Sequence, residues 1–251
     1  MIKLFAANWK MHKTTGEAGQ TAADLHKLTA DKLPAGREVL LIPTFTGLEA
    51  VKKALGTDER YSSGAQNFYP QKQGAFTGEI SPAMLKDVGA SYALTGHSER
   101  RHVLGETDEL VGAKTVFGLA EGLRIILCVG EKIEERKAGK LAEVLTRQLT
   151  IGTRDVPKDV APEYLSIAYE PVWAIGTGEV AGPAEIIEAH ALVRSLLLQI
   201  FGDSGAKMRI LYGGSVKPDN ATEIIALDNV DGVLVGGASL KADDFSRIVL
   251  A

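Results

Sequence analysis

Two stretches near the end of the chain decide the fold: Leu211-Tyr212-Gly213-Gly214-Ser215 and Leu234-Val235-Gly236-Gly237-Ala238-Ser239. In each stretch a short apolar run, typical of a buried strand, ends in a pair of glycines. Such pairs let backbone N–H groups approach an anion closely, although they also suit tight turns that need positive φ. Because the same ending occurs twice, we favour a phosphate-binding site at the ends of these two strands.

Similar runs rich in Val, Ile and Leu recur along the chain, and longer amphipathic stretches separate them. This pattern is typical of a parallel sheet covered by helices. We expect strands at residues 3–8, 38–42, 61–66, 92–95, 124–129, 164–169, 209–212 and 232–235. We expect helices at residues 14–33, 46–55, 106–121, 132–149 and 183–201.

Eight strands in 251 residues favour an α/β fold, specifically a closed (β/α)8 barrel with eight parallel strands ringed by helices. Such a barrel needs roughly 250 residues. A doubly wound open sheet has the same local pattern, so periodicity alone does not decide closure. The sequence contains no linker and no low-complexity segment. We therefore expect a single domain over residues 1–251.

Composition excludes several classes of function. The formal net charge is -4, and no cluster of Lys and Arg is dense enough to bind nucleic acid. No apolar run is long enough to span a membrane and the first residues lack a signal peptide, so we expect a cytoplasmic protein without a membrane partner. A single cysteine cannot form an internal disulfide, and the five histidines lack metal-ligand spacing. We expect no metal and no cofactor.

Two polar residues follow the first strand, in Asn8-Trp9-Lys10. Active sites of such barrels are built where the strands end at their carboxyl side. Lys10 can hold a phosphate or stabilise a developing oxyanion there, or it can be a solvated surface lysine. Asn8 can donate a neutral hydrogen bond, or it can simply form a turn.

His97 follows the fourth strand, in Gly96-His97-Ser98-Glu99-Arg100, just before an expected short helix. Backbone N–H groups at a helix start disfavour a charged imidazole, so we expect a neutral ring that can donate to a substrate oxygen. A satisfied structural histidine is the alternative. Glu99 can orient Lys10, or it can pair with Arg100 or Arg101.

Glu170 ends the sixth strand, in Ala168-Tyr169-Glu170-Pro171. Apolar neighbours would desolvate its carboxylate and strengthen it as a base, whereas the alternative is an exposed carboxylate before a turn. The following segment, residues 172–178, joins apolar residues to small ones, as a mobile lid does. Cys128, on the fifth expected strand, is most simply a buried small residue.

Taken together, Asn8-Trp9-Lys10-Met11, Gly96 to Arg101, Tyr169 to Gly178 and Tyr212 to Val216 resemble the triosephosphate isomerase family. The segments Gly74 to Glu79, Cys128 to Glu131 and Val235 to Ala238 strengthen the resemblance, and all keep the family's order.

The resemblance implies an enzyme of glycolysis and gluconeogenesis that interconverts dihydroxyacetone phosphate and glyceraldehyde 3-phosphate through an enediol intermediate. Glu170 would be the base, His97 a neutral electrophile and Lys10 the third catalytic residue. The other implied roles are substrate binding by Asn8, Lys10, Gly176, Ser215, Gly236 and Gly237, support by Ser98, Glu99 and Cys128, and a lid formed by Trp173, Ala174, Ile175, Thr177 and Gly178. It also implies a homodimer in which Thr77 approaches the partner's site.

Three positions depart from the forms usual in this family. His12 replaces an asparagine, Thr95 replaces an aliphatic residue, and Glu179 stands in the lid where lysine is usual. We expect the first two to alter packing only, and Glu179 to affect association or lid closure.

Three rival functions stay open at this level. A Schiff-base aldolase could use Lys10, but no second lysine at a strand end is present to activate it. A metal-dependent epimerase needs clustered ligands that the sequence lacks. A non-catalytic barrel that binds triose phosphate would share the fold, and fold likeness cannot exclude it.

Overall fold

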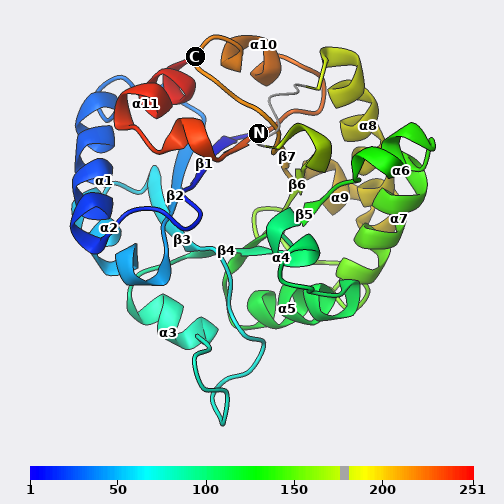
Figure 1. Cartoon of the computed structure of the whole chain (residues 1–251), viewed down its shortest axis with the longest axis horizontal. Coiled ribbons are helices and arrows are strands. Elements are labelled where there is room, and N and C mark those ends of the chain that lie inside the picture. The colour runs from blue at the N-terminus through cyan, green and yellow to red at the C-terminus, as the bar shows by residue number, and fades with distance from the viewer. Residues whose placement is uncertain (176–180) are drawn as a thin grey trace.

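The strands form one closed barrel, in sequential order from β1 to β8, in a computed structural model that describes residues 1–175 and 181–251 (Figure 1). All neighbouring strands are parallel, and β8 pairs with β1 to close the ring. The strands are β1 (Lys3–Asn8), β2 (Arg37–Ile42), β3 (Tyr61–Ala65), β4 (Tyr92–Thr95), β5 (Arg124–Val129), β6 (Leu165–Tyr169), β7 (Ile210–Tyr212) and β8 (Gly232–Val235). The predicted closed barrel is confirmed, and the open sheet was the wrong alternative.

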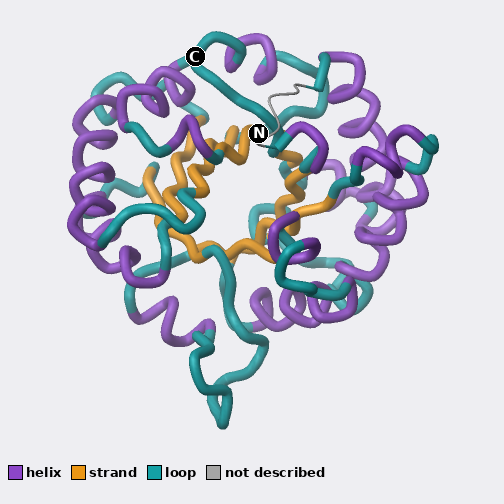
Figure 2. Tube along the Cα trace, viewed as in Figure 1, coloured by secondary structure: helices purple, strands orange, loops and turns teal. Residues whose placement is uncertain are grey.

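The helices form an outer ring around these strands (Figure 2). The longer ones are α1 (Thr15–Thr29), α2 (Leu48–Leu55), α5 (Asp108–Ala120), α7 (Leu141–Gly152), α8 (Pro183–Phe201) and α11 (Ala242–Leu250). The shorter ones are α3 (Pro82–Asp87), α4 (Ser98–His102), α6 (Ile133–Lys137), α9 (Asp203–Lys207) and α10 (Ala221–Ile225). Short 3-10 turns occupy Phe45–Gly47, Val172–Ala174 and Gly237–Ser239.

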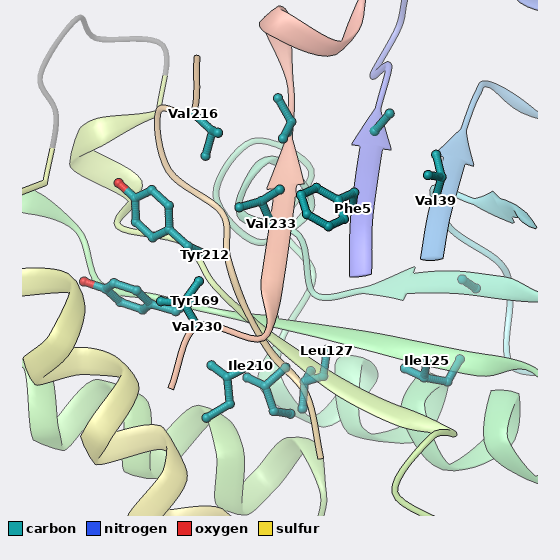
Figure 3. Close-up of a cluster of buried hydrophobic side chains, with 14 of the residues drawn as sticks. Phe5, Val39, Ile125, Leu127, Tyr169, Ile210, Tyr212, Val216, Val230 and Val233 are labelled. Carbon is teal, nitrogen blue, oxygen red and sulfur yellow. The ribbon is translucent and has the colours of Figure 1, made fainter. Parts of the chain in front are cut away.

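Two separate apolar layers hold the barrel. Alternate strand residues point inward, so Leu4 and Ala6 of β1 belong to the cluster inside the barrel. Phe5, between them, belongs to the larger cluster between the barrel and its helices (Figure 3). Complete burial of each large apolar side chain contributes roughly 1.5–3 kcal/mol, which explains why near-continuous apolar runs form these strands.

The helix expected at residues 132–149 is in fact two helices, α6 and α7. Gly139 lies between them with φ of +67°, a left-handed conformation that ends a helix. The expected helix at 14–33 ends earlier, at Thr29. Four helices, α3, α9, α10 and α11, were not expected from the sequence. Each has at most nine residues, too few for a clear helical period.

No helix within residues 1–175 and 181–251 is long and apolar enough to cross a membrane.

Candidate active site

A cavity of about 420 Å³ lies at the carboxyl ends of the strands. The predicted residues Asn8, Lys10, His97 and Glu170 line it, although they come from three different strand ends. Both glycine pairs also line this cavity. The remaining lining residues are Trp9, His12, Ala174, Ile175, Gly213, Gly214, Ser215, Val216, Lys217, Leu234, Gly236, Gly237, Ala238 and Leu240.

The backbone at Lys10 is held in an uncommon conformation. Its φ is +52°, a left-handed value that costs free energy in a residue with a side chain. Asn8 Oδ1 accepts the Lys10 N–H at 3.0 Å, and Gln66 Nε2 donates to the Lys10 carbonyl at 2.7 Å. These two bonds fix the turn that directs Lys10 into the cavity.

The Lys10 ammonium pairs with the Glu99 carboxylate, with Nζ and Oε1 2.6 Å apart. This settles the alternatives left open for Glu99, because Arg100 pairs instead with Glu106 and Arg101 with Asp108. An ammonium held in an ion pair has no free electron pair, so the geometry speaks against Lys10 as a Schiff-base nucleophile.

Glu170 and His97 are in direct contact at the buried side of the cavity. His97 Nε2 lies 3.0 Å from Glu170 Oε1, and both side chains are almost completely buried. The other carboxylate oxygen, Oε2, accepts the Ser98 N–H at 2.9 Å. On the far side of the ring, His97 Nδ1 accepts the Glu99 N–H at 3.3 Å. The neutral ring therefore carries its proton on Nε2, which is the atom that faces Glu170.

The two groups shift each other's pKa. Burial alone lowers the pKa of His97, but the adjacent Glu170 carboxylate more than offsets this and the pKa is raised from 6.5. Burial alone raises the pKa of Glu170, but the His97 ring and the Ser98 N–H more than offset this and the pKa is lowered from 4.5. The ring expected to be neutral is thus drawn toward its charged form for as long as Glu170 faces it.

The first glycine of each pair lies close to a charged side chain of the site. A Cβ at Gly213 would lie 2.9 Å from Glu170 Cγ, and one at Gly236 would lie 3.2 Å from Lys10 Cε. Any larger residue at Gly213 would displace the carboxylate. The glycines therefore leave room for both charged side chains and for an anion on the backbone.

Comparisons with known proteins agree with this geometry. The family model described as Triosephosphate isomerase matches residues 3–251. The chain is 65% identical to the triosephosphate isomerase of Nitratidesulfovibrio vulgaris strain Miyazaki F over 251 residues, covering all of both chains. It is 58% identical to the triosephosphate isomerase of Oleidesulfovibrio alaskensis, again over the full length of both. It also resembles the crystal structure of triosephosphate isomerase from Bartonella henselae, with a TM-score of 0.88 and 42% identity over 99% of this chain and 98% of that one.

The chain belongs to the triosephosphate isomerase family. It is an isomerase, so the non-catalytic alternative is set aside. For the metal-dependent alternative, the described part of the chain contains no group of three or more His, Cys, Asp or Glu side chains that could hold a metal ion.

The remaining predicted site residues lie beside Glu170, along the cavity, in an exposed loop, or outside the described residues. Ser98 and Cys128 lie beside Glu170, and burial raises the pKa of the Cys128 thiol, which keeps it protonated. Ala174 and Ile175 line the cavity. Thr77 lies in an exposed loop and is not among the cavity's lining residues. Gly176, Thr177, Gly178 and Glu179 lie outside the described residues.

The sequence did not indicate a role for Glu131, a buried carboxylate after β5 that contacts the start of the expected lid. Glu131 is fully buried, and its Oε1 accepts the Trp173 indole N–H at 2.9 Å and the Tyr169 hydroxyl at 3.1 Å. It thereby ties Trp173, the first lid residue, to the barrel. Glu131 stands within the Cys128 to Glu131 segment of the family resemblance, but the local sequence gives no signal for its partners.

Two of the three family departures can be placed. Thr95 is buried and its hydroxyl lies 3.0 Å from that of Thr115, so the polar substitution is satisfied inside the barrel wall. His12 lines the edge of the cavity, where it can meet solvent or a partner rather than only alter packing.

Proposed function

We propose that this chain interconverts dihydroxyacetone phosphate and glyceraldehyde 3-phosphate without a cofactor, as a step of glycolysis and gluconeogenesis. The observation that carries the mechanism is the 3.0 Å contact between His97 and Glu170 inside the cavity that also holds Lys10 and both glycine pairs. This arrangement supports the proposal, because groups suited to act as base, hydrogen-bond donor, cation and anion site lie around one cavity of a size for a small phosphorylated substrate.

Glu170 acts as the base. It takes the proton from the carbon next to the carbonyl, and the electrons of that C–H bond form the double bond of an enediolate. A proton passes from the neighbouring hydroxyl to the former carbonyl oxygen, and the same carboxyl group returns a proton to the neighbouring carbon. Atoms and electrons therefore balance, with no net oxidation or reduction. Its burial supports this role once the carboxylate leaves His97 and Ser98, because a desolvated carboxylate without those partners holds a proton more strongly than one in water.

His97, Lys10 and Asn8 serve the substrate oxygens. The Nε2–H of His97 donates to the carbonyl oxygen, and the Lys10 ammonium stabilises the negative charge that develops there. Asn8 uses its Oδ1 on the Lys10 backbone, which leaves its amide NH2 to donate to the substrate.

Glu170 must turn before it can react. In the structure it accepts hydrogen bonds from Ser98 N–H and faces His97 Nε2, which are competing partners for its oxygens. When Glu170 turns toward the substrate, burial and the nearby Lys10 ammonium favour the neutral His97 ring. The base and the donor are thus released from each other in one movement.

The phosphate group is held by backbone N–H groups at the ends of β7 and β8. Ser215, Gly236 and Gly237 line the cavity, and Gly176 is the fourth residue we assign to this role. Ala174 and Ile175, which line the cavity, belong to the lid that we propose closes over the substrate and keeps the intermediate away from water, whereas its residues 176–178 lie outside the described residues.

We also infer a homodimer in the cytoplasm, formed by single-domain chains. The connection between β3 and α3 protrudes beyond the helix ring, and it carries Phe76 with 38% of its surface exposed (Figure 1). An exposed aromatic residue at the end of a protruding loop suits insertion into a second copy, which would bring Thr77 to the partner's site. One closed barrel, in which α11 packs against α1, supports a single domain over residues 1–251.

The decisive experiment compares wild type with Glu170→Gln on glyceraldehyde 3-phosphate, in chelator-treated buffer without cofactor. Loss of the base should lower kcat by at least about 100-fold with a smaller change in KM. Glu143→Gln, at a 65% exposed carboxylate, is the matched control and should leave both constants unchanged. Equal turnover in Glu170→Gln and wild type, at verified equal folding, would remove Glu170 as the base. Absence of turnover in folded wild type would return the non-catalytic alternative, and imine trapping by borohydride would return the aldolase.

A further inference from the structure

A second cavity, of about 260 Å³, lies at the opposite end of the barrel and is called here the floor cavity. Its charged lining residues lie at or just before the starts of strands. They are Glu38 of β2, Arg124 of β5, Glu163 before β6, and Lys207 and Arg209 before β7. None of them has a part in the proposed isomerisation, because the active-site cavity lies at the other ends of the strands.

Two guanidinium groups share a single carboxylate at the floor cavity. Arg209 Nη1 lies 2.9 Å from Glu38 Oε2, and Arg124 Nη1 lies 3.2 Å from Glu38 Oε1. Both arginines also donate to the Tyr92 hydroxyl, at 3.0 and 3.1 Å. Burial raises the pKa of Tyr92, so its hydroxyl stays neutral and offsets no positive charge. This layer therefore holds one positive charge more than its single carboxylate neutralises.

The two arginines differ in their access to water. The Arg209 side chain is only 6% exposed and pairs with Glu38, whereas that of Arg124 is 39% exposed. The positive charge that Glu38 does not neutralise is therefore accessible at Arg124. An anion in the floor cavity would supply the missing charge where Arg124 can reach it.

Lys207 increases the positive potential of the same cavity. Its ammonium makes no hydrogen bond or ion pair within residues 1–175 and 181–251. Glu163 is the opposing charge, and it is exposed to solvent. The lining side chains thus include three cations, Arg124, Lys207 and Arg209, against two carboxylates, and the carboxylate nearest the arginines is already shared.

We propose that the floor cavity binds a small oxyanion of the phosphate class. The planar guanidinium of Arg124 can donate in parallel to two phosphate oxygens, and the mobile ammonium of Lys207 can reach a third. A phosphate has oxygens for all of these donors, whereas a carboxylate has two. The cavity has room for inorganic phosphate or for a small phosphate monoester.

The test is thermal unfolding of the full chain in increasing inorganic phosphate, with ionic strength held constant by chloride. Wild type is compared with Lys207→Gln, Lys207→Arg and the matched control Lys32→Gln. Lys32 is an exposed lysine shortly before β2 that lines no part of the floor cavity, and its replacement makes the same change in net charge. For each variant the rise in Tm is measured from its own Tm without phosphate, so a change in basal stability does not affect the comparison. Phosphate inhibition of turnover, measured on the same proteins, reports active-site binding separately.

If the floor cavity binds phosphate, Lys207→Gln should lose about half or more of the phosphate-dependent rise in Tm. Lys207→Arg and Lys32→Gln should retain it, and the phosphate inhibition constant should be the same in all four proteins. Repeating the series with glycerol 3-phosphate distinguishes a site for inorganic phosphate from a site for a phosphate monoester. A monoester site should give a larger difference in Tm rise between wild type and Lys207→Gln with glycerol 3-phosphate than with inorganic phosphate. Equal rises in Tm for Lys207→Gln and Lys32→Gln, with both anions, overturn the proposal. If wild type shows no turnover, the proposed function fails, but the phosphate-dependent rises in Tm still test the floor cavity because they do not depend on activity.

Discussion

The carboxylate of Glu170, the candidate base, faces two hydrogen-bond donors at the buried side of the cavity. Ser98 N–H and His97 Nε2 lie 2.9 and 3.0 Å from its two oxygens. Both interactions favour the charged carboxylate, so its pKa is lowered despite complete burial. The residue is thus kept deprotonated at neutral pH, ready to accept a proton, at the expense of a movement that must precede catalysis.

The coupling of these two groups gives a direct prediction at the residue scale. In Glu170→Gln the charge that raises the His97 pKa is lost while the ring stays buried. We expect the His97 pKa to fall below its ordinary value of 6.5. NMR titration of the His97 ring measures it.

Glu99→Gln is the matched control for this titration. Glu99 Oε2 lies 3.6 Å from His97 Nδ1, but the Glu99 side chain is 47% exposed and its charge is screened by water. Its loss should lower the His97 pKa by less than the loss of Glu170 does. An equal effect of both variants, or no effect of either, would contradict the coupling.

Individual site residues could be predicted from sequence because each stands next to a strand end. Their contacts could not, since His97 and Glu170 are 73 positions apart and Lys10 and Glu99 are 89 apart. The partner of Glu99 is a case in point. Three cations were plausible from the sequence, and the choice of Lys10 depends on Glu106 and Asp108 taking the two neighbouring arginines.

At the scale of elements, Arg101 joins the ends of two strands to a helix. Its side chain is 6% exposed, and it donates to the Gly96 carbonyl at 2.7 Å and to the Cys128 carbonyl at 3.2 Å. It also pairs with Asp108 at the start of α5. Gly96 immediately precedes His97, so Arg101 holds the end of β4 against the end of β5 where the candidate base and donor meet.

Arg101→Lys should therefore lower kcat by roughly 10- to 100-fold with a smaller effect on KM, because a lysine cannot make all three contacts and a displacement near 1 Å is costly. Steady-state kinetics at several pH values measure this. Arg147→Lys is the matched control, since Arg147 binds the same Asp108 carboxylate at 3.0 Å from a half-exposed position. Unchanged kcat in a folded Arg101→Lys variant would show that the strand ends keep their positions without it.

The positions of helices and strands were predictable where the pattern of apolar residues extends over enough residues to be recognised. All eight strands were located to within one residue at each end, because buried parallel strands are short and apolar. The break between α6 and α7 was missed because the residues on either side keep helical character and only Gly139 changes direction. Closure of the barrel was not readable from period alone, since it depends on β8 pairing with β1, and the repeated glycine pairs were its only local sign.

At the scale of the whole molecule, His190 links pH to stability. It lies in α8 with an exposed fraction of 0%, and its Nδ1 is 2.9 Å from the Asn229 carbonyl. Its Nε2 is buried without a hydrogen-bond partner among the described residues. Burial lowers the pKa of His190 from 6.5 to about 4.

The consequence has a definite sign and pH window. Between pH 6.5 and about 4 the unfolded chain takes up a proton on His190 and the folded chain does not. The free energy of unfolding should thus fall by up to about 3 kcal/mol as pH falls through this range, and this group should cause no further loss below it. Two other groups change the free energy of unfolding outside this range. The pKa of His97 is raised, so its contribution changes above pH 6.5. The pKa of Asp58 is lowered from 3.8 to about 2, mainly by its hydrogen bond with Arg60, so its contribution changes below pH 3.8.

Denaturant unfolding of wild type and His190→Gln at fixed protein concentration, from pH 7.5 to 4, measures this effect. Glutamine keeps an N–H that can donate to the Asn229 carbonyl but takes up no proton, so the variant should lose stability less steeply between pH 6.5 and 4 even if it is less stable at pH 7.5. His12→Gln is the matched control, because it makes the same substitution at an exposed position outside the core, and it should leave the wild-type slope. Parallel curves for wild type and His190→Gln would mean that the folded chain admits a proton at this position, and the acid sensitivity of the barrel would then have to originate elsewhere.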